Sequence, residues 1–207
     1  GAAAGRSAAR LEAQAELGVA SINQALATSA VEHDVVLAGV RVLGPGALTP
    51  TADLETELAA AQTMARLRAW RRETNADVVS VWAEPTSAVP GRLCGLGYVV
   101  TNVSAHAAYG VSIVPENCAV ADYSFAHEVG HNLGMEHDRA NTKGPGIDPF
   151  SYGYQHFTST PGLAFRDVMA YECAAGPCAR RALYSSPRLQ FNGAPAGIDF
   201  DADAGRA

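Results

Sequence analysis

His127-Glu-Val-Gly-His131-Asn-Leu-Gly134-Met-Glu-His137-Asp places three histidines within eleven residues. On a helix, His127 and His131 are four residues apart and project from one face, so both imidazoles can reach a single Zn²⁺. His137 lies six residues beyond His131 and would point away from the metal if the helix continued. Gly134 can adopt a positive φ, which ends the helix and turns the chain back beneath the ion. The stretch therefore predicts a zinc site with three histidine ligands.

Glu128 lies beside the first histidine and is the candidate general base. Zinc held by three neutral imidazoles keeps one position open for water, whose pKa falls toward about 7. Glu128 can take the proton of that water and deliver it to the leaving amine of a peptide. The alternative, surface histidines on an amphipathic helix, is disfavoured by the complete spacing. A purely structural zinc is disfavoured because such sites usually have four protein ligands with Cys prominent.

The segment is similar to the His-Glu-x-x-His-x-x-Gly-x-x-His signature of the metzincin zinc peptidases, at all five defining positions. This resemblance implies an α/β (α+β) metzincin fold, with a mixed twisted sheet and helices in an upper lobe, the active-site helix at the cleft, and an irregular lower lobe. We expect one catalytic domain over residues 1–207, divided at about residue 137. A catalytically silent module that binds polypeptides without cutting them is the alternative, and the intact Glu128 and histidines argue against it.

The resemblance also implies a methionine turn downstream of the third histidine. Met169 fits, because Met64 lies far upstream and Met135 lies inside the histidine motif. The methionine of this turn is a packing residue and not a ligand. The interpretation as a methionine turn and the interpretation as an ordinary core methionine therefore coincide. In astacin-like and serralysin-like branches, a Met-x-Tyr arrangement brings a phenol to the zinc, where it can stabilise an oxyanion. Tyr171 has this spacing, with ordinary packing or cleft lining as its alternative.

Shorter stretches of the sequence resemble those of the reprolysin (adamalysin) branch and of its bacterial peptidyl-Asp metallopeptidase-like group. Asp138 follows the third histidine directly, as in reprolysins. That group implies a preference for an acidic residue after the scissile bond, and metzincins form the wall of the corresponding pocket from the segment after the methionine turn, here residues 172–183. Arg180 and Arg181 lie there, and a guanidinium at the pocket base would select a carboxylate. Two exposed arginines at the end of a helix near 180–184 are the alternative.

Four cysteines allow three pairings if all are oxidised. We favour Cys94–Cys118, which would staple the segment before the active-site helix to the preceding sheet, and Cys173–Cys178, which would close a short loop after the methionine turn. The even count beside a histidine-based zinc site indicates disulfides and an oxidising compartment, with four reduced thiols in a cytosolic protein as the alternative. Gly1 to Ser7 do not resemble a signal peptide. We therefore expect a mature or trimmed domain that is secreted, extracellular or periplasmic.

Composition limits the partners. The net charge of −6 and pI near 5.5 argue against nucleic acid or an anionic membrane surface. No apolar run reaches the roughly 18–20 residues of a membrane span. We expect a monomer that takes a polypeptide substrate and is held latent by a propeptide or protein inhibitor. Calcium is undecided, because four available carboxylates lack the spacing of a known site: Asp138, Asp148, Asp199 and Asp201.

Periodicity predicts helices over residues 8–30, from Thr51 to about Arg72, and from a cap at Asp122 or Ser124. Strands are expected over residues 35–43, 77–83, 96–103 and 108–114. The first strand of the family is missing, because residues 1–7 do not resemble one. We expect the substrate to pair with an edge strand around 103–111. His106 and Tyr109 would then contact it at the rim, with plain surface positions as the alternative.

Overall fold

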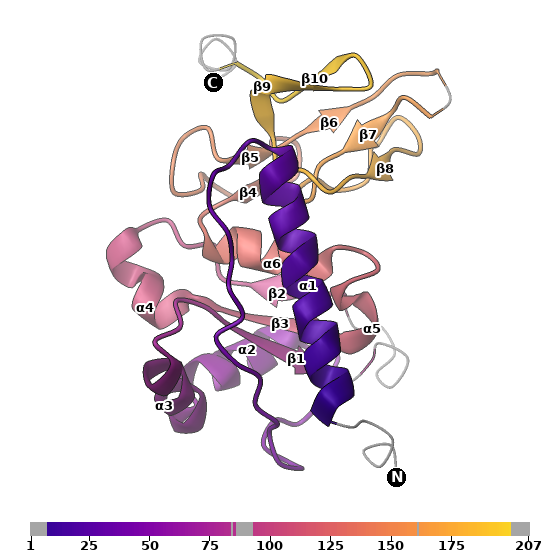
Figure 1. The fold of residues 1–207 in the computed structure, drawn as a ribbon. Helices are drawn as coiled ribbons and strands as arrows, with labels where there is room; N and C mark the ends of the chain where they lie inside the picture. The colour runs from indigo at the N-terminus through magenta and orange to yellow at the C-terminus, as the bar shows by residue number, and fades with distance from the viewer. Residues whose placement is uncertain (1–7, 84, 86–92, 161, 200–207) are drawn as a thin grey trace.

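The computed structural model describes residues 8–83, 85, 93–160 and 162–199 (Figure 1). Helix α1 (Ala8–Thr28) confirms the first predicted helix. Its apolar face supplies Ile22, Ala25 and Leu26 to a buried cluster that also contains Phe125 and Met169. The predicted absence of the first family strand concerns residues 1–7, which lie outside the described part.

A three-stranded sheet forms the centre of this part of the chain. Its order is β1 (Val79–Ala83), β3 (Val111–Pro115), β2 (Leu96–Gly97), with β1 parallel and β2 antiparallel to β3. All five residues of β3 are buried, and four of them are apolar, as is typical of a strand covered on both faces. The fifth, Ser112, donates a hydrogen bond from its hydroxyl to that of Ser80 at 3.1 Å. Side chains alternate along β3, so Val111 and Ile113 enter one cluster and Val114 another. The mixed α and β architecture that the sequence predicts is confirmed.

Two helices cover one face of this sheet where a single helix was expected. The prediction of one helix from Thr51 to Arg72 is wrong, because Met64 has an extended backbone and separates α2 (Leu54–Thr63) from α3 (Ala65–Thr74). Asp53 caps α2 through the backbone N–H groups of Glu55 and Thr56. The opposite face of the sheet is covered by α1 and the histidine helix, α6 (Ser124–Asn132).

Several predicted strands are shorter or absent. Residues 35–43 form no strand, because no described segment pairs with them, although the Asn23 side chain makes two hydrogen bonds to the backbone of Val35. The strand expected over 96–103 is limited to β2. The edge strand expected around 103–111 is wrong: a 3₁₀ turn η3 (Val103–Ala105) and α4 (His106–Tyr109) occupy most of it. The short helix α5 (Glu116–Ala119) then leads toward α6.

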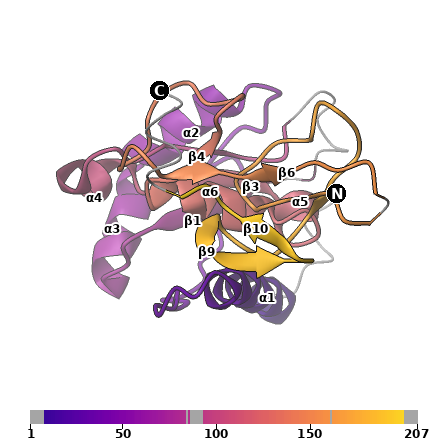
Figure 2. The ribbon, with the colours of Figure 1, turned by 90° about the horizontal axis from the view of Figure 1, so that it is seen from above.

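The remaining described chain consists of short strands at one end of the molecule (Figure 1). They form three small sheets: β4 (Glu136–Asp138) with β5 (Tyr152–Gly153), β6 (Gln155–His156) with β7 (Phe165–Arg166) and β8 (Ala179–Arg180), and β9 (Ser186–Phe191) with β10 (Ala194–Ala196). The helix expected near 180–184 is wrong, because β8 occupies its start. Figure 2 shows β9 and β10 close to the end of α1, where the Ser29 hydroxyl donates to the Tyr184 carbonyl at 2.9 Å.

Two disulfides join Cys94 to Cys118 and Cys173 to Cys178, which confirms the favoured pairing. The first links the segment just before β2 to α5, and the second closes a loop ahead of β8. None of the helices in the described ranges has the length and apolar character of a membrane span.

Candidate metal centre

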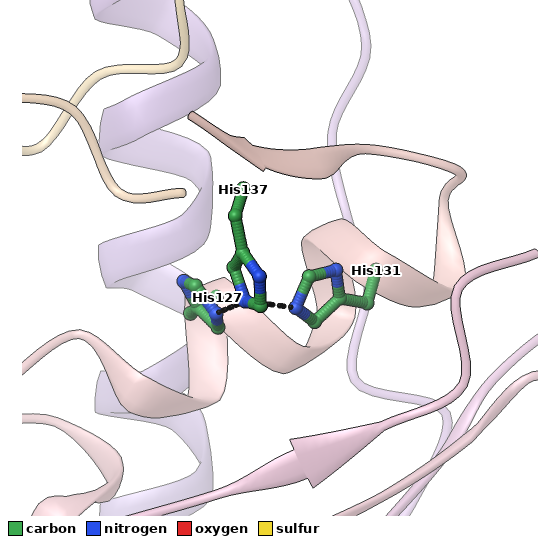
Figure 3. Close-up of side chains that lie close together, drawn as sticks. All are labelled: His127, His131 and His137. Atoms are coloured by element: carbon green, nitrogen blue, oxygen red, sulfur yellow. Dashed lines mark hydrogen bonds between the residues drawn. The ribbon is translucent and has the colours of Figure 1, made fainter. Parts of the chain in front are cut away.

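Helix α6 and strand β4 bring the three histidines together (Figure 3). His127 and His131 project from one face of α6. Gly134 follows the helix with φ of +93° and lies so close to Ile147 that a Cβ would approach within 2.5 Å. Positive φ and tight packing both require glycine here, as the sequence predicts. The expected helix caps were wrong, because Tyr123, with φ of +56°, precedes the first turn of α6 without a side-chain cap.

The three Nε2 atoms face a common point. His137 Nε2 lies 3.0 Å from His131 Nε2 and 3.2 Å from His127 Nε2. His127 Nδ1 donates to the Val168 carbonyl and His131 Nδ1 to the Met135 carbonyl, both at 2.8 Å. A carbonyl only accepts, so these Nδ1 atoms carry the protons and the Nε2 atoms present lone pairs.

Unprotonated Nε2 atoms cannot form hydrogen bonds with one another, whereas they can all coordinate one metal ion. Burial is the main cause that lowers the pKa of all three imidazoles, to about 4 for His131 and well below its usual range for His127. Neutral imidazoles are the form that binds metal. Nitrogens in tetrahedral zinc sites with bonds of about 2.0–2.1 Å lie about 3.3 Å apart, which is close to the observed separations.

A second group with metal-binding side chains, Cys94, Cys118 and Asp122, does not offer thiolates, because its two cysteines form a disulfide. Within the described residues, Asp148 and Asp199 belong to no such group of three. Asp201 lies outside the described part. The carboxylate of Asp138 has protein partners, because it accepts hydrogen bonds from the Tyr171 N–H at 3.0 Å and from the Asn141 amide.

Glu128 is 5% exposed, and its carboxylate lies against the backbone of β2 and the residue before it. A Cβ at Gly95 would approach Glu128 Oε1 within 2.4 Å, and one at Gly97 would approach Oε2 within 3.1 Å. Burial raises the pKa of the carboxyl to about 8, and Arg180 opposes this shift. A group with this pKa can exchange protons near neutral pH. The role of Gly95 and Gly97 is not evident from their sequence positions.

The candidate methionine turn lies under the histidines. Met169 is buried, and its Sδ would lie 2.4 Å from a Cβ at Gly130, so glycine on α6 permits the contact. Two residues on, the Tyr171 ring lies 4.2 Å from the His137 ring, centre to centre. Burial raises the pKa of Tyr171, with Glu128 as the next cause, which keeps the phenol protonated at neutral pH.

The four substrate-contact candidates lie in different places. Arg180 is largely buried, and its Nη1 donates to the Asp122 carbonyl at 2.7 Å. Arg181 instead stacks its guanidinium over the Phe191 ring, 5.5 Å from the ring centre. Tyr109 is 42% exposed and contacts the Tyr98 ring edge-on at 5.2 Å. The side chain of His106 lies outside the described part.

Asn132 is fully buried on α6 and has a structural role that was not predicted from the sequence. Its amide donates to the carbonyls of Tyr98, at 3.0 Å, and Val111, at 3.1 Å. These bonds tie the histidine helix to the end of β2 and the start of β3. The only available sequence signal was an amide at a buried helical position, which requires partners because unpaired buried amides are costly.

A family profile and individual relatives of this chain both belong to the metallopeptidases. The sequence profile of metallo-peptidase family M12, of reprolysin type, matches residues 4–180. A peptidyl-Asp metalloendopeptidase from Stenotrophomonas maltophilia is 31% identical over 93% of this chain and 44% of its own length. One from Xanthomonas campestris is 37% identical over 53% of this chain and 24% of its own length. The chain thus spans less than half the length of either relative.

The fold also matches a solved structure titled "Structure of a chaperone-substrate complex". The TM-score is 0.63 at 21% identity, covering 92% of this chain and 29% of that one. At this identity the likeness supports the fold alone.

Proposed function

The chain belongs to metallo-peptidase family M12, and from that membership we propose that it is a zinc-dependent endopeptidase. One observation carries the proposal: the Nε2 atoms of three imidazoles converge, and the buried Glu128 directly follows the first of these histidines on α6. Their spacing suits one zinc ion with a free coordination position.

The mechanism assigns each step to a side chain of this protein. His127, His131 and His137 would hold the ion, which when bound supplies Lewis acidity toward a carbonyl oxygen and an attacking water. Glu128 takes a proton from that water as it attacks the peptide carbonyl carbon, and then delivers the proton to the leaving amine nitrogen. The Tyr171 hydroxyl donates to the carbonyl oxygen as negative charge develops on it.

We place the substrate against β2 in place of the segment around 103–111. In the described part, β2 pairs with β3 on one side only, so its other side can accept an extended peptide by strand addition. Gly95 and Gly97 contact Glu128, so a peptide on this edge would lie beside the general base.

The proposed specificity is for an acidic residue after the scissile bond. The relatives from Stenotrophomonas and Xanthomonas are named peptidyl-Asp metalloendopeptidases, and we extend that preference to this chain. Arg180 supports it, because this guanidinium is close enough to influence the pKa values of Glu128 and Tyr171. Arg181 is oriented toward Phe191, so we assign it no part in selection.

Cellular context completes the proposal. Two disulfides fit an oxidising compartment, which favours secretion or the periplasm. We propose one catalytic domain with two lobes, supported by the bonds between Ser29 and Tyr184. We also propose that the protein acts as a monomer and that a propeptide or inhibitor controls it. Calcium remains an open expectation.

Zinc titration of metal-free protein tests the function. We expect one zinc per chain and peptide hydrolysis that appears in proportion to bound zinc. Glu128→Gln should bind the same amount of zinc while hydrolysis falls about 10²- to 10⁴-fold. Bound zinc without hydrolysis of any peptide by the unaltered protein would favour a silent polypeptide-binding module instead.

A further inference from the structure

Three polar side chains form a row across the sheet β6-β7-β8. Gln155 pairs in register with Arg166 on the neighbouring strand, and Arg166 pairs with Arg180 on the next. Register partners project from the same face of a sheet, so all three side chains lie on one face. Like charges directly opposite one another destabilise a sheet, so the adjacent guanidiniums require a reason.

The row binds the backbone that follows the methionine turn. Arg166 Nη1 donates to the Ala170 carbonyl at 2.8 Å, and Arg180 Nη2 donates to the same oxygen at 3.3 Å. Gln155 Nε2 donates to the next carbonyl, that of Tyr171, at 2.9 Å. Two guanidiniums therefore converge on one oxygen, immediately beside the residue whose ring contacts His137.

The negative charge at this pair comes from an exposed side chain. Glu172 contacts Arg166 Nη2 in an ion pair, with the Glu172 side chain 71% exposed and that of Arg166 12% exposed. Asp167 is a second nearby carboxyl, and burial raises its pKa to about 7, so it is a poor source of fixed negative charge. Asp122 also acts on Arg180, but less strongly than Glu172 does. Of these three carboxyls, Glu172 forms the ion pair with Arg166, and its exposure lets it move into solvent.

The pair also lies within electrostatic range of the metal centre. Arg180 influences the pKa values of His127, Glu128 and Tyr171. Arg166 is the largest charged influence on Arg180, whose own pKa is lowered by burial and then by this neighbour. A further carboxylate at the pair would relieve that repulsion.

We propose that Arg166 and Arg180 together form a carboxylate-binding subsite for an acidic side chain of the substrate, and that Glu172 occupies Arg166 until that side chain replaces it. This rests on the proposed endopeptidase function and names the groups that would read its substrate. Guanidiniums bind carboxylates through paired charge-assisted hydrogen bonds, which suits aspartate or glutamate. Glu172 offsets one of the two positive charges in the free protein and competes with the substrate.

Paired peptides that differ only in Asp or Asn at one central position test the subsite. Their binding to zinc-loaded Glu128→Gln protein is followed by fluorescence anisotropy, and their hydrolysis is followed with active protein. We expect the Asp peptide to bind roughly 10- to 100-fold more tightly, as for hydrogen bonds to charged groups. In the same background, Arg180→Gln should reduce that ratio to near one, and Glu172→Gln should tighten binding of the Asp peptide several-fold. Arg188→Gln, on the exposed surface of β9, is the matched control and should leave the ratio unchanged.

The binding results test the carboxylate-binding subsite, and the hydrolysis results test the endopeptidase function. Equal binding of both peptides, or a folded Arg180→Gln protein that keeps the full preference, overturns it. A Glu172→Gln protein that binds the Asp peptide no more tightly overturns the role of Glu172 as competitor, and this exposed side chain can be changed without disturbing the fold. If the Asp preference in binding is present but no peptide is hydrolysed, the subsite stands and the endopeptidase function fails.

Discussion

Backbone carbonyls orient the histidine rings at the scale of single residues. Val168, next to Met169, accepts from His127, and Met135 accepts from His131. The candidate methionine turn therefore contributes a carbonyl that accepts a hydrogen bond from His127, as well as a side chain beneath the histidines. Such a bond fixes the ring tautomer that presents Nε2 to a metal. Sequence spacing predicted the ligands but not these bonds, because the carbonyls of any segment look alike in a sequence.

Tyr171→Phe tests whether the phenol stabilises negative charge during hydrolysis. The substitution removes one hydroxyl from a ring that lies 4.2 Å from the His137 ring, centre to centre, and leaves this tilted ring contact intact. We expect kcat to fall about 10²- to 10³-fold, as for loss of one oxyanion donor, with little change in KM. Steady-state kinetics on one peptide measure both constants. An unchanged kcat would return Tyr171 to simple packing.

Asp167→Asn tests the buried carboxyl beside the methionine turn. Burial raises its pKa in the folded state to about 7, against the ordinary value of 3.8, while the backbone N–H of Ala170 opposes the shift. The folded state therefore retains a proton that the unfolded state releases, so the native protein should lose stability as pH rises from about 4 to about 7. Asparagine keeps the acceptor for Ala170 but does not ionise. The free energy of unfolding of the native protein, relative to Asp167→Asn, should thus fall by a few kcal/mol across this range in denaturant titrations. A pH-independent difference would contradict the assignment.

At the scale of elements, β2 and α6 together position Glu128, the proposed general base. Glu128 on α6 occupies space that side chains at Gly95 and Gly97 would fill, and Asn132 on the same helix bonds to the carbonyl of Tyr98, just beyond β2. The edge of the sheet and the histidine helix are thus packed as one unit around the Glu128 carboxylate.

Gly95→Ala should displace that carboxylate. The added methyl would lie 2.4 Å from Glu128 Oε1. We expect kcat to fall at least tenfold while the zinc content stays at one per chain, because even small misplacements of a catalytic group are costly. Gly44→Ala is the matched control, since a Cβ there meets nothing within 4 Å. Equal activity of both variants would show that Glu128 tolerates displacement.

Comparison of the predicted and observed helices and strands shows where sequence patterns were sufficient to predict secondary structure. Helices α1 and α6 carry long or motif-bearing apolar faces, and the sequence predicted both. Residues 35–43 read as a strand because they are rich in valine, yet a strand exists only with a partner, and no described segment supplies one. The segment near 180–184 begins in strand β8, at Arg180, because β8 pairs with β7, a tertiary contact that propensity does not encode.

At the scale of the whole molecule, the candidate site draws on segments far apart in the sequence. The motif at 127–138 was sufficient to predict that three histidines come together in a group that could hold a metal ion, since all three lie within it. The Gln155, Arg166 and Arg180 row spans three strands, and its register could not be read before the pairing was known. The meeting of the three histidines could therefore be predicted from the sequence, whereas the groups around them depend on strand pairing.

The two disulfides should contribute unequally to stability. Cys94 and Cys118 are 24 residues apart, whereas Cys173 and Cys178 are five apart. Since stabilisation grows with loop length, alanine at both positions of the first pair should cost about 3 kcal/mol in the free energy of unfolding, roughly 1 kcal/mol more than at the second. Denaturant titration measures both, and the reverse order would contradict the loop-closure account.

The central claim is that this protein hydrolyses peptide bonds through His127, His131, His137 and Glu128. Its most direct test is to digest a proteome-derived peptide library with zinc-loaded protein and with Glu128→Ala, and to map new termini by mass spectrometry. We predict cuts from the unaltered protein alone, with acidic residues enriched after the cut. Identical cuts from both proteins, or none from either with zinc bound, would contradict the claim.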